Sequence, residues 1–245
     1  MPTCNLQHHS PRYLELDMLR GIAVLLMIVY HALFDLEYFF DIAVPGGLDA
    51  WTMLSRITAT LFLLTVGIVS AISWEHTPSE RRWPKSLRRA ALLLAAGMAV
   101  SLATRIAIPH APVYFGILHL IGLSALLQPM FHPLGAWNTL AGIVALSIPT
   151  AAGSWSTLPF GFPPSGLASV DYYPLLPWFG IVLIGMAAGH ALYVPSRHWL
   201  LHIFARIRYP YCLLWCGRHA LFLYFVHQPV LLGMLTLVRA VWRAR

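Results

Sequence analysis

The first long apolar stretch of the chain, residues 16–40, reads LDMLRGIAVLLMIVYHALFDLEYFF. A helix needs about 20 such residues to cross a hydrocarbon core of about 30 Å. Apolar stretches of about this length recur along the chain, and lipid admits only helices or closed barrels as spanning structures. The stretches are too long, and alternate too weakly, for barrel strands. The sequence therefore predicts an all-α, polytopic transmembrane helical bundle.

The composition is typical of a protein whose surface faces lipid. Of the 245 residues, 58% are hydrophobic and only 10% are charged, whereas a soluble domain has about 25% charged residues. The formal net charge is +7, but the basic residues lie mostly beside predicted spans, where the positive-inside rule accounts for them without nucleic acid. The three cysteines imply no disulfide framework, and Cys212 and Cys216 lack the further ligands of a metal site.

We expect about seven spans, within a range of six to eight, in one domain that covers residues 1–245. Basic loops orient the bundle, because Lys and Arg concentrate on the cytosolic side. Arginines precede the third and the last spans, so the N-terminal tail at 1–14 is predicted to be cytosolic and the C-terminus to lie outside. Arg239 and Arg243 count against that last placement, and an eighth crossing is the alternative. The expected spans are 17–40, 51–74, 88–108, 114–130, 136–152, 176–194 and 219–240.

Polar side chains form a stripe on one face of the first predicted span. At 100° per residue, Asp17, Arg20, His31 and Asp35 fall within an arc of about 60°, and the stripe runs about 27 Å along the helix. A charged group in mid-membrane is costly and marks a site or a pathway by default. Asp17 and Arg20 are also explained as interfacial anchors that pair locally. We single out His31, because Asp35 one turn beyond can orient its imidazole and stabilise the charged form.

Other polar residues are expected near the two ends of this stripe. Arg56 lies about as far from the outer end of its span as Asp35 does, which predicts an ion pair between them. Arg56 is therefore as much a structural as a functional candidate. His119 lies similarly deep in the fourth span, where a lone histidine is usually a satisfied core residue. The layout suits an anionic, phosphate-bearing donor in the cytosol and an acceptor outside. The remaining candidates are Asp171 and Trp178 near the outer mouth, Arg218 at the inner end, and His227 with Gln228 about 12 Å into the last span.

Five blocks of the chain occur in the order of a known family and cover nearly its whole length. They read RYLELDMLRGIAVLLMIVYHALFDL at 12–36, GILHLIG at 116–122, DYYPLLPWFG at 171–180, GRH at 217–219 and YFVHQP at 224–229. These blocks resemble the bacterial heparan-α-glucosaminide N-acetyltransferase-like membrane family. Arg20 and His31 also have the Arg-x10-His spacing of the wider transmembrane acyltransferase group, which acylates sugars of envelope glycans.

The resemblance implies transfer of an acetyl or other acyl group from cytosolic acyl-CoA to a sugar or glycan acceptor outside a bacterial inner membrane. His31, oriented by Asp35, would be a general base or would transiently take the acyl group, with His119 as a further catalytic candidate. Arg20 and Arg218 would hold the donor's phosphates, and no metal is expected. The acceptor would meet Arg56, Asp171, Trp178, His227 and Gln228.

The resemblance has one departure. The lysosomal animal relatives have an Asn where this chain has His31, and a catalytic His in the loop that follows. Residues 39–51 contain no His. The departure leaves the acceptor open.

Two functions of other classes compete with this hypothesis. A proton-coupled transporter would use the stripe as a relay, yet the stripe has no titratable group between Arg20 and His31. A non-enzymatic scaffold would need Asp35 and Arg56 for stability and could dispense with His31. Acyl-CoA binding separates the enzyme from the transporter, and the formation of a homodimer is left open.

Overall fold

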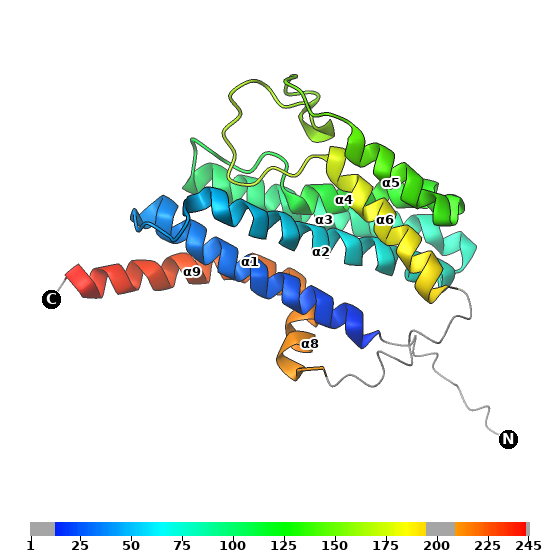
Figure 1. The fold of residues 1–245 in the computed structure, drawn as a ribbon, viewed down its shortest axis with the longest axis horizontal. Coiled ribbons are helices and arrows are strands. Elements are labelled where there is room, and N and C mark those ends of the chain that lie inside the picture. The colour runs from blue at the N-terminus through cyan, green and yellow to red at the C-terminus, as the bar shows by residue number, and fades with distance from the viewer. Residues whose placement is uncertain (1–12, 195–208, 244–245) are drawn as a thin grey trace. The chain divides into compact units, whose positions relative to one another are not determined.

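The computed structural model describes residues 13–194 and 209–243, and its regular elements there are helices (Figure 1). Six stretches are long and apolar enough to cross a membrane, which confirms the predicted polytopic helical bundle and makes the chain an integral membrane protein. The helices are α1 Leu14–Phe40, α2 Gly47–Glu75, α3 Ser79–Ala107, α4 Ile117–Phe131, η1 His132–Trp137, α5 Asn138–Ser147, η2 Leu158–Phe160, α6 Leu175–Tyr193, α8 Tyr211–Arg218 and α9 Ala220–Arg243.

One predicted span is wrong, and one predicted loop is helical. The expected fifth span, 136–152, is the ten-residue helix α5, which is about 15 Å long and too short to cross a bilayer alone. It follows a turn in η1 where Gly135 has φ +51°. Helix α3 begins at Ser79, ahead of the expected span at 88–108, because basic residues favour helix as well as apolar ones do. The arginines expected in a loop therefore lie on the first turns of α3.

The chain divides into two compact units, which are described separately. One comprises Met1–Ala43 with Ile207–Arg245, and the other comprises Val44–Arg206. The first unit contains α1, α8 and α9, and the second contains α2 to α6. The single domain expected over 1–245 stays a prediction, and most of the expected tail and the arginines at 197, 206 and 208 lie outside the described residues.

In the first unit, α1 packs very closely against α8. A Cβ at Gly21 would overlap the Leu213 carbonyl, and a Cβ at Gly217 would overlap the Asp17 carbonyl. Glycine at both positions therefore lets the two backbones touch. This explains why the blocks LRG and GRH contain a glycine beside their arginine.

Helices α1 and α9 run in the same direction. Asp17 near the start of α1 contacts Arg218, just before α9, while the Arg239 guanidinium lies 5.5 Å from the centre of the Phe40 ring at the other end. The last span therefore ends on the same side as the first. The sides of the membrane on which the termini lie, and an eighth crossing, stay predictions.

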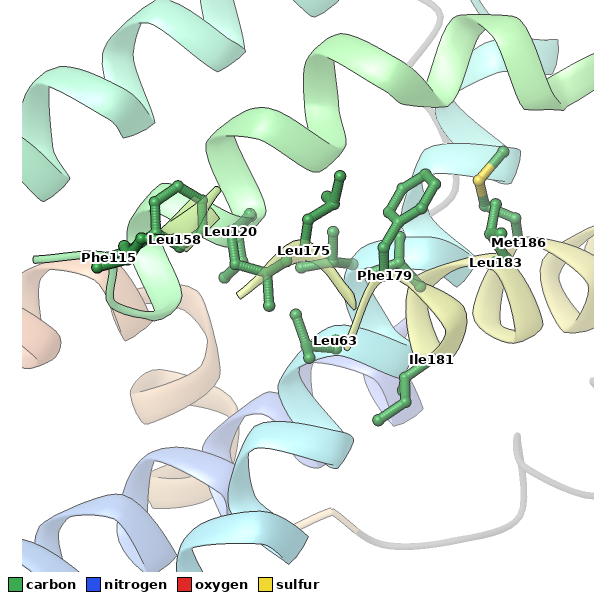
Figure 2. Packing of buried hydrophobic residues seen from close by; sticks show 12 residues of the cluster. Leu63, Phe115, Leu120, Leu158, Leu175, Phe179, Ile181, Leu183 and Met186 are labelled. Atoms are coloured by element: carbon green, nitrogen blue, oxygen red, sulfur yellow. The ribbon is translucent and has the colours of Figure 1, made fainter. Parts of the chain in front are cut away.

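The second unit has a hydrophobic core between α2, α4 and α6 (Figure 2). Leu63, Leu120 and Met186 are completely buried there. Leu158 of η2 belongs to the same cluster, and the Tyr172 hydroxyl donates to its carbonyl at 2.7 Å. The long loop between α5 and α6 is therefore folded against the helices, as its apolar composition predicts.

Candidate functional site

His31 lies in the C-terminal half of α1, half-buried, and its Nδ1 is 2.9 Å from the Met27 carbonyl oxygen one turn earlier. A carbonyl only accepts hydrogen bonds, so Nδ1 carries the proton. In the neutral ring, Nε2 is then the unprotonated nitrogen. The helix backbone therefore presents His31 as a proton acceptor through Nε2.

Asp35 does not orient His31 as predicted. Its Oδ1 accepts a hydrogen bond of 2.6 Å from the side-chain amide of Gln228 on α9, and His31 instead binds the Met27 carbonyl. Asp35 is completely buried, and its Oδ2 has no hydrogen-bond partner among the residues described. The physical reason is that a backbone carbonyl lies within reach of His31 on its own helix, while the carboxylate meets a donor from α9. The bond from Gln228 links the two parallel helices.

His227 supplies the close neighbour of His31. The two ring centres are 4.7 Å apart with an angle of 76° between the planes, so one ring presents its edge to the other. His227 is buried, and its Nδ1 lies 2.8 Å from the Tyr224 carbonyl. By the argument used for His31, Nδ1 of His227 carries the proton. Its buried Nε2 has no partner in the described chain, so both rings keep Nε2 as the acceptor.

The inner end of the stripe is a three-residue charge cluster. Asp17 Oδ1 lies 3.5 Å from Arg20 Nη1, which confirms the predicted local pairing. Asp17 Oδ2 lies 3.4 Å from Arg218 Nε. One carboxylate is thus shared by two guanidinium groups, and the cluster keeps an excess positive charge. A cluster of this kind can bind an anion.

The second unit contains a separate group of predicted site residues at the start of α4. The Gly116 N–H donates to His119 Nδ1 at 3.3 Å, and the Ile117 N–H donates to Asp171 Oδ2 at 3.3 Å. The first N–H groups of a helix have no partner within it, so both side chains cap α4. These contacts account for His119 and Asp171 in structural terms.

Asp171 lies in the loop before α6, and burial raises the pKa of its carboxyl to about 6. The hydrogen bond from Ile117 acts in the opposite direction and is the smaller effect. The segment that carries Asp171 runs beside residues 111–117, since the Tyr173 N–H donates to the Phe115 carbonyl at 2.9 Å. Two of the sequence blocks, GILHLIG and DYYPLLPWFG, therefore meet.

Tyr173 contacts one predicted acceptor residue, Trp178, and the residue before another, Arg56. Its hydroxyl lies 2.7 Å from the hydroxyl of Ser55 on α2, and its ring centre lies 4.8 Å from that of Trp178. Ser55 precedes Arg56, which is exposed. The predicted ion pair between Arg56 and Asp35 joins residues of different units and stays a prediction.

Sequence reasoning missed two relationships at the site. It treated His227 and Gln228 as substrate-binding residues, and it did not pair them with His31 and Asp35. The signal was weak, because residues on α1 and α9 are nearly 200 positions apart: the Asp35–Gln228 bond spans 193. In the part of the chain that the structure describes, no group of three or more His, Cys, Asp or Glu side chains could hold a metal ion.

Comparison with known proteins assigns a family. The family model described as "Heparan-alpha-glucosaminide N-acetyltransferase, catalytic" matches residues 12–229. That range contains all the candidate residues of both units. No curated protein and no solved structure gives a significant match to the chain. The chain belongs to the heparan-alpha-glucosaminide N-acetyltransferase catalytic family.

Proposed function

We propose that the protein transfers an acetyl or other acyl group from cytosolic acyl-CoA to a hydroxyl or amine of a sugar or glycan on the outer side of the membrane. Family membership makes a membrane acetyltransferase-like role the starting point. The observation that carries the finer proposal is the hydrogen bond between His31 Nδ1 and the Met27 carbonyl. It leaves Nε2 to accept a proton, as a general base must.

In the proposed reaction, His31 Nε2 takes the proton of the acceptor hydroxyl or amine as that group attacks the thioester carbonyl. The new C–O or C–N bond forms, the C–S bond breaks, and the thiolate of CoA leaves. The imidazolium then returns the proton to the sulfur. No other reactant is needed, and the histidine ends as it began.

His227 and the Asp35–Gln228 pair are positioning residues in this proposal. The His227 ring limits the orientations open to His31, because the rings meet edge to face at 4.7 Å. The bond between Asp35 and Gln228 holds α9 beside α1. Each of these contacts lies within the first unit, so the positioning of His31 rests on that unit alone.

We assign the donor's phosphates to Arg20 and Arg218, which share Asp17 and keep an excess positive charge. Their side chains are 25% and 35% exposed, so both are open to a ligand. In the second unit, Arg56, Asp171 and Trp178 stay predicted acceptor-binding residues. There, His119 and Asp171 would act by fixing the start of α4.

A proton relay along α1 is less well supported. The buried residues of α1 between Gly21 and His31 are Ala23, Val24 and Met27, which neither donate nor accept protons. A relay would need titratable groups or water between the inner cluster and His31. Acyl transfer needs neither, because Arg20 would bind the donor at one end of the stripe and His31 would act as the base at the other.

The test compares His31→Ala with His76→Ala. His76 is a matched control, because its Nδ1 also binds the carbonyl of the fourth residue before it, Ile72, at 2.8 Å and its side chain is exposed. Purified protein is incubated with labelled acetyl-CoA and envelope glycan extract, and the product is identified by mass spectrometry. We expect His31→Ala to abolish transfer while His76→Ala retains it.

An active, folded His31→Ala variant would overturn the assignment. A second readout distinguishes His31 as a general base from His31 as a transient carrier of the acyl group. Rapid quenching of the wild-type reaction, followed by peptide mass spectrometry, would reveal an acyl group on His31 if the ring itself carries it. Without that adduct, His31 acts as the base.

A further inference from the structure

A pocket in the second unit lies between the end of α2 and the first turns of α3, away from every residue assigned above. The space inside it is about 370 Å³ with open solvent included, so the pocket is a depression open to one side. By the positive-inside rule this end of α3 faces the cytosol. The lining residues that matter are Ser73, Trp74, Thr77, Arg82, Lys85, Arg89, Gln128 and His132.

The charge of the lining is unbalanced. Arg82 and Lys85 line the pocket, and none of the described residues brings a carboxylate into its lining. Lys85 Nζ donates to the hydroxyls of Ser73 and Thr77, at 2.7 and 2.9 Å. These partners are neutral, so they place the ammonium group without cancelling its charge.

Arg82 is held in a similar way. Its Nε donates to the Thr77 carbonyl at 3.0 Å, and its guanidinium carbon lies 4.7 Å from the centre of the Trp74 ring. Neither contact uses the two terminal nitrogens of the guanidinium group, and no hydrogen bond joins them to another described residue. A planar fork in this state suits an anion with two or more oxygens.

Two buried side chains that line the pocket, Gln128 and His132, have polar atoms without a partner in the described part of the chain, which is independent support for a ligand there. Gln128 is 3% exposed and its Nε2 has no hydrogen-bond partner within the described ranges. His132 is 5% exposed; its Nε2 lies 3.1 Å from the Ser70 hydroxyl, and its Nδ1 is unpaired there. An unpaired buried N–H donor is costly. A ligand oxygen at the pocket would satisfy the Gln128 amide.

Membrane topology alone does not explain this arrangement. Arg82, Lys85 and Arg89 are spaced i, i+3 and i+7, which places them on one face of α3. Arg81 and Arg88 lie on the same helix, are exposed and do not line the pocket. Positive charges on any face of α3 would serve to orient the span. Only the face with Arg82 and Lys85 lines the pocket together with Ser73, Thr77 and Gln128, so membrane orientation does not account for it.

We propose that this pocket binds the phosphate group of a phosphate ester, with Arg82, Lys85 and the Gln128 amide as its ligands. Two sources have this chemistry and reach this side of a membrane: the phosphates of a soluble CoA-type nucleotide, and the phosphate of an anionic lipid headgroup. The site does not depend on acyl transfer, because all its residues lie in the second unit and none is assigned to the reaction.

The experiment measures binding to the purified full chain. One arm titrates CoA by calorimetry in a detergent free of anionic lipid. The other counts phosphatidylglycerol molecules retained on the protein by native mass spectrometry. The variant Arg82→Gln with Lys85→Gln is compared with Arg81→Gln with Arg88→Gln, which removes the same charge from the same helix.

We expect the pocket variant to weaken binding of at least one probe about tenfold or more, because it removes charged hydrogen-bond donors. The control pair should stay within about twofold of wild type, as exposed charges do. Loss of a CoA equivalent that Arg20→Gln with Arg218→Gln retains identifies the nucleotide as the source, and loss of phosphatidylglycerol identifies the lipid. Equal losses in the two variant pairs, or no loss with either probe, would overturn the proposal.

A second variant covers the case in which the double variant does not fold. Gln128→Glu keeps the shape of the side chain but turns a donor into a carboxylate that repels phosphate. It should weaken the same probe, and unchanged binding in a folded Gln128→Glu protein contradicts the site. His31→Ala should bind the probes as wild type does, so a failed acyl-transfer proposal is distinguishable from a failed phosphate site.

Discussion

His31 on α1 and His119 on α4 each form a hydrogen bond with the backbone of their own helix region, with opposite results. His31 lies in the middle of its helix, where the available backbone group is a carbonyl, so Nδ1 donates to Met27. His119 lies in the first turn, where N–H groups are free, so Nδ1 accepts from Gly116. His31 therefore has Nε2 as an acceptor, and neutral His119 has its proton there. The place of a histidine within its helix decides whether it can act as a base.

The largest expected effect comes from making the same substitution at both positions. In His31→Asn, the amide can still donate to the Met27 carbonyl, but the basic Nε2 is gone. We expect the transfer rate to fall by about 100-fold or more, the usual contribution of a general base. In His119→Asn, the side-chain oxygen can still accept from Gly116, so the rate should stay close to that of wild type. The measurement is labelled acetyl transfer per folded molecule.

A similar loss in both variants would break the comparison, since it would give His119 a part in the reaction. Folded protein is quantified by size-exclusion chromatography before each assay. An additional check is nitrogen NMR of labelled histidine, which should find the proton on Nδ1 of His31 and on Nε2 of His119.

The next effect concerns the helices that hold His31. Gln228→Leu removes the amide that donates to Asp35 at 2.6 Å and leaves a buried carboxylate without this donor. We expect the free energy of unfolding to fall by about 2 kcal/mol, as for a hydrogen bond to a charged group. Unfolding in mixed micelles of increasing SDS content measures it.

Asp35→Asn serves as the partner variant for Gln228→Leu. The double variant should be more stable than the sum of the two single losses predicts, because it leaves no unpaired buried charge. Strict additivity would mean that the two side chains do not interact.

A smaller effect is expected at the start of α4. His119→Leu removes the acceptor for the Gly116 N–H and should lower the free energy of unfolding by about 1 kcal/mol, the usual cost of losing a helix cap. His119→Asn should cost less, because its side-chain oxygen can still accept from the Gly116 N–H. The same SDS unfolding assay measures both. Equal stability of the Leu and Asn variants would show that the cap contributes nothing.

The smallest effect is a pH dependence of stability that arises from Asp171. Burial raises the pKa of this carboxyl from 3.8 to about 6, so the folded protein keeps a proton that the unfolded chain has released. This contribution to stability is complete below about pH 4 and is lost as the pH rises through about 6. Melting temperatures between those values should decline in wild type more than in Asp171→Asn. Identical pH profiles for the two proteins would contradict the raised pKa.

Much of the fold could be predicted because its signals are local. The apolar stretch at 16–40 becomes α1, and the pairing of Asp17 with Arg20 follows from their spacing in a helix. The expected fifth span is too long, because α5 ends at Ser147 and Ile148, the residue before Pro149, is already extended, as residues before a proline tend to be. Helix α8 was not predicted, since eight residues are too few for a periodic signal.

Less of the candidate site could be predicted. The sequence placed His31 and Asp35 one turn apart and therefore paired them, whereas Asp35 takes its hydrogen bond from Gln228. His119 was chosen for its depth in the membrane, which says nothing about the free N–H groups beside it. The basic face of α3 was assigned to a loop, so the pocket that it lines with Gln128 was not expected.

By itself, the sequence determined the all-helical membrane architecture, the polar face of α1 and the family. Each of these depends on hydropathy, periodicity or motifs within a continuous stretch of chain. Such signals do not depend on what that stretch packs against. Only the tertiary structure decided the partners: Asp17 with Arg218, 201 positions apart, Asp35 with Gln228, and the ring of His227 against His31. The reason is that partners are selected by which helices come into contact, and in the first unit Gly21 and Gly217 allow one such contact between backbones.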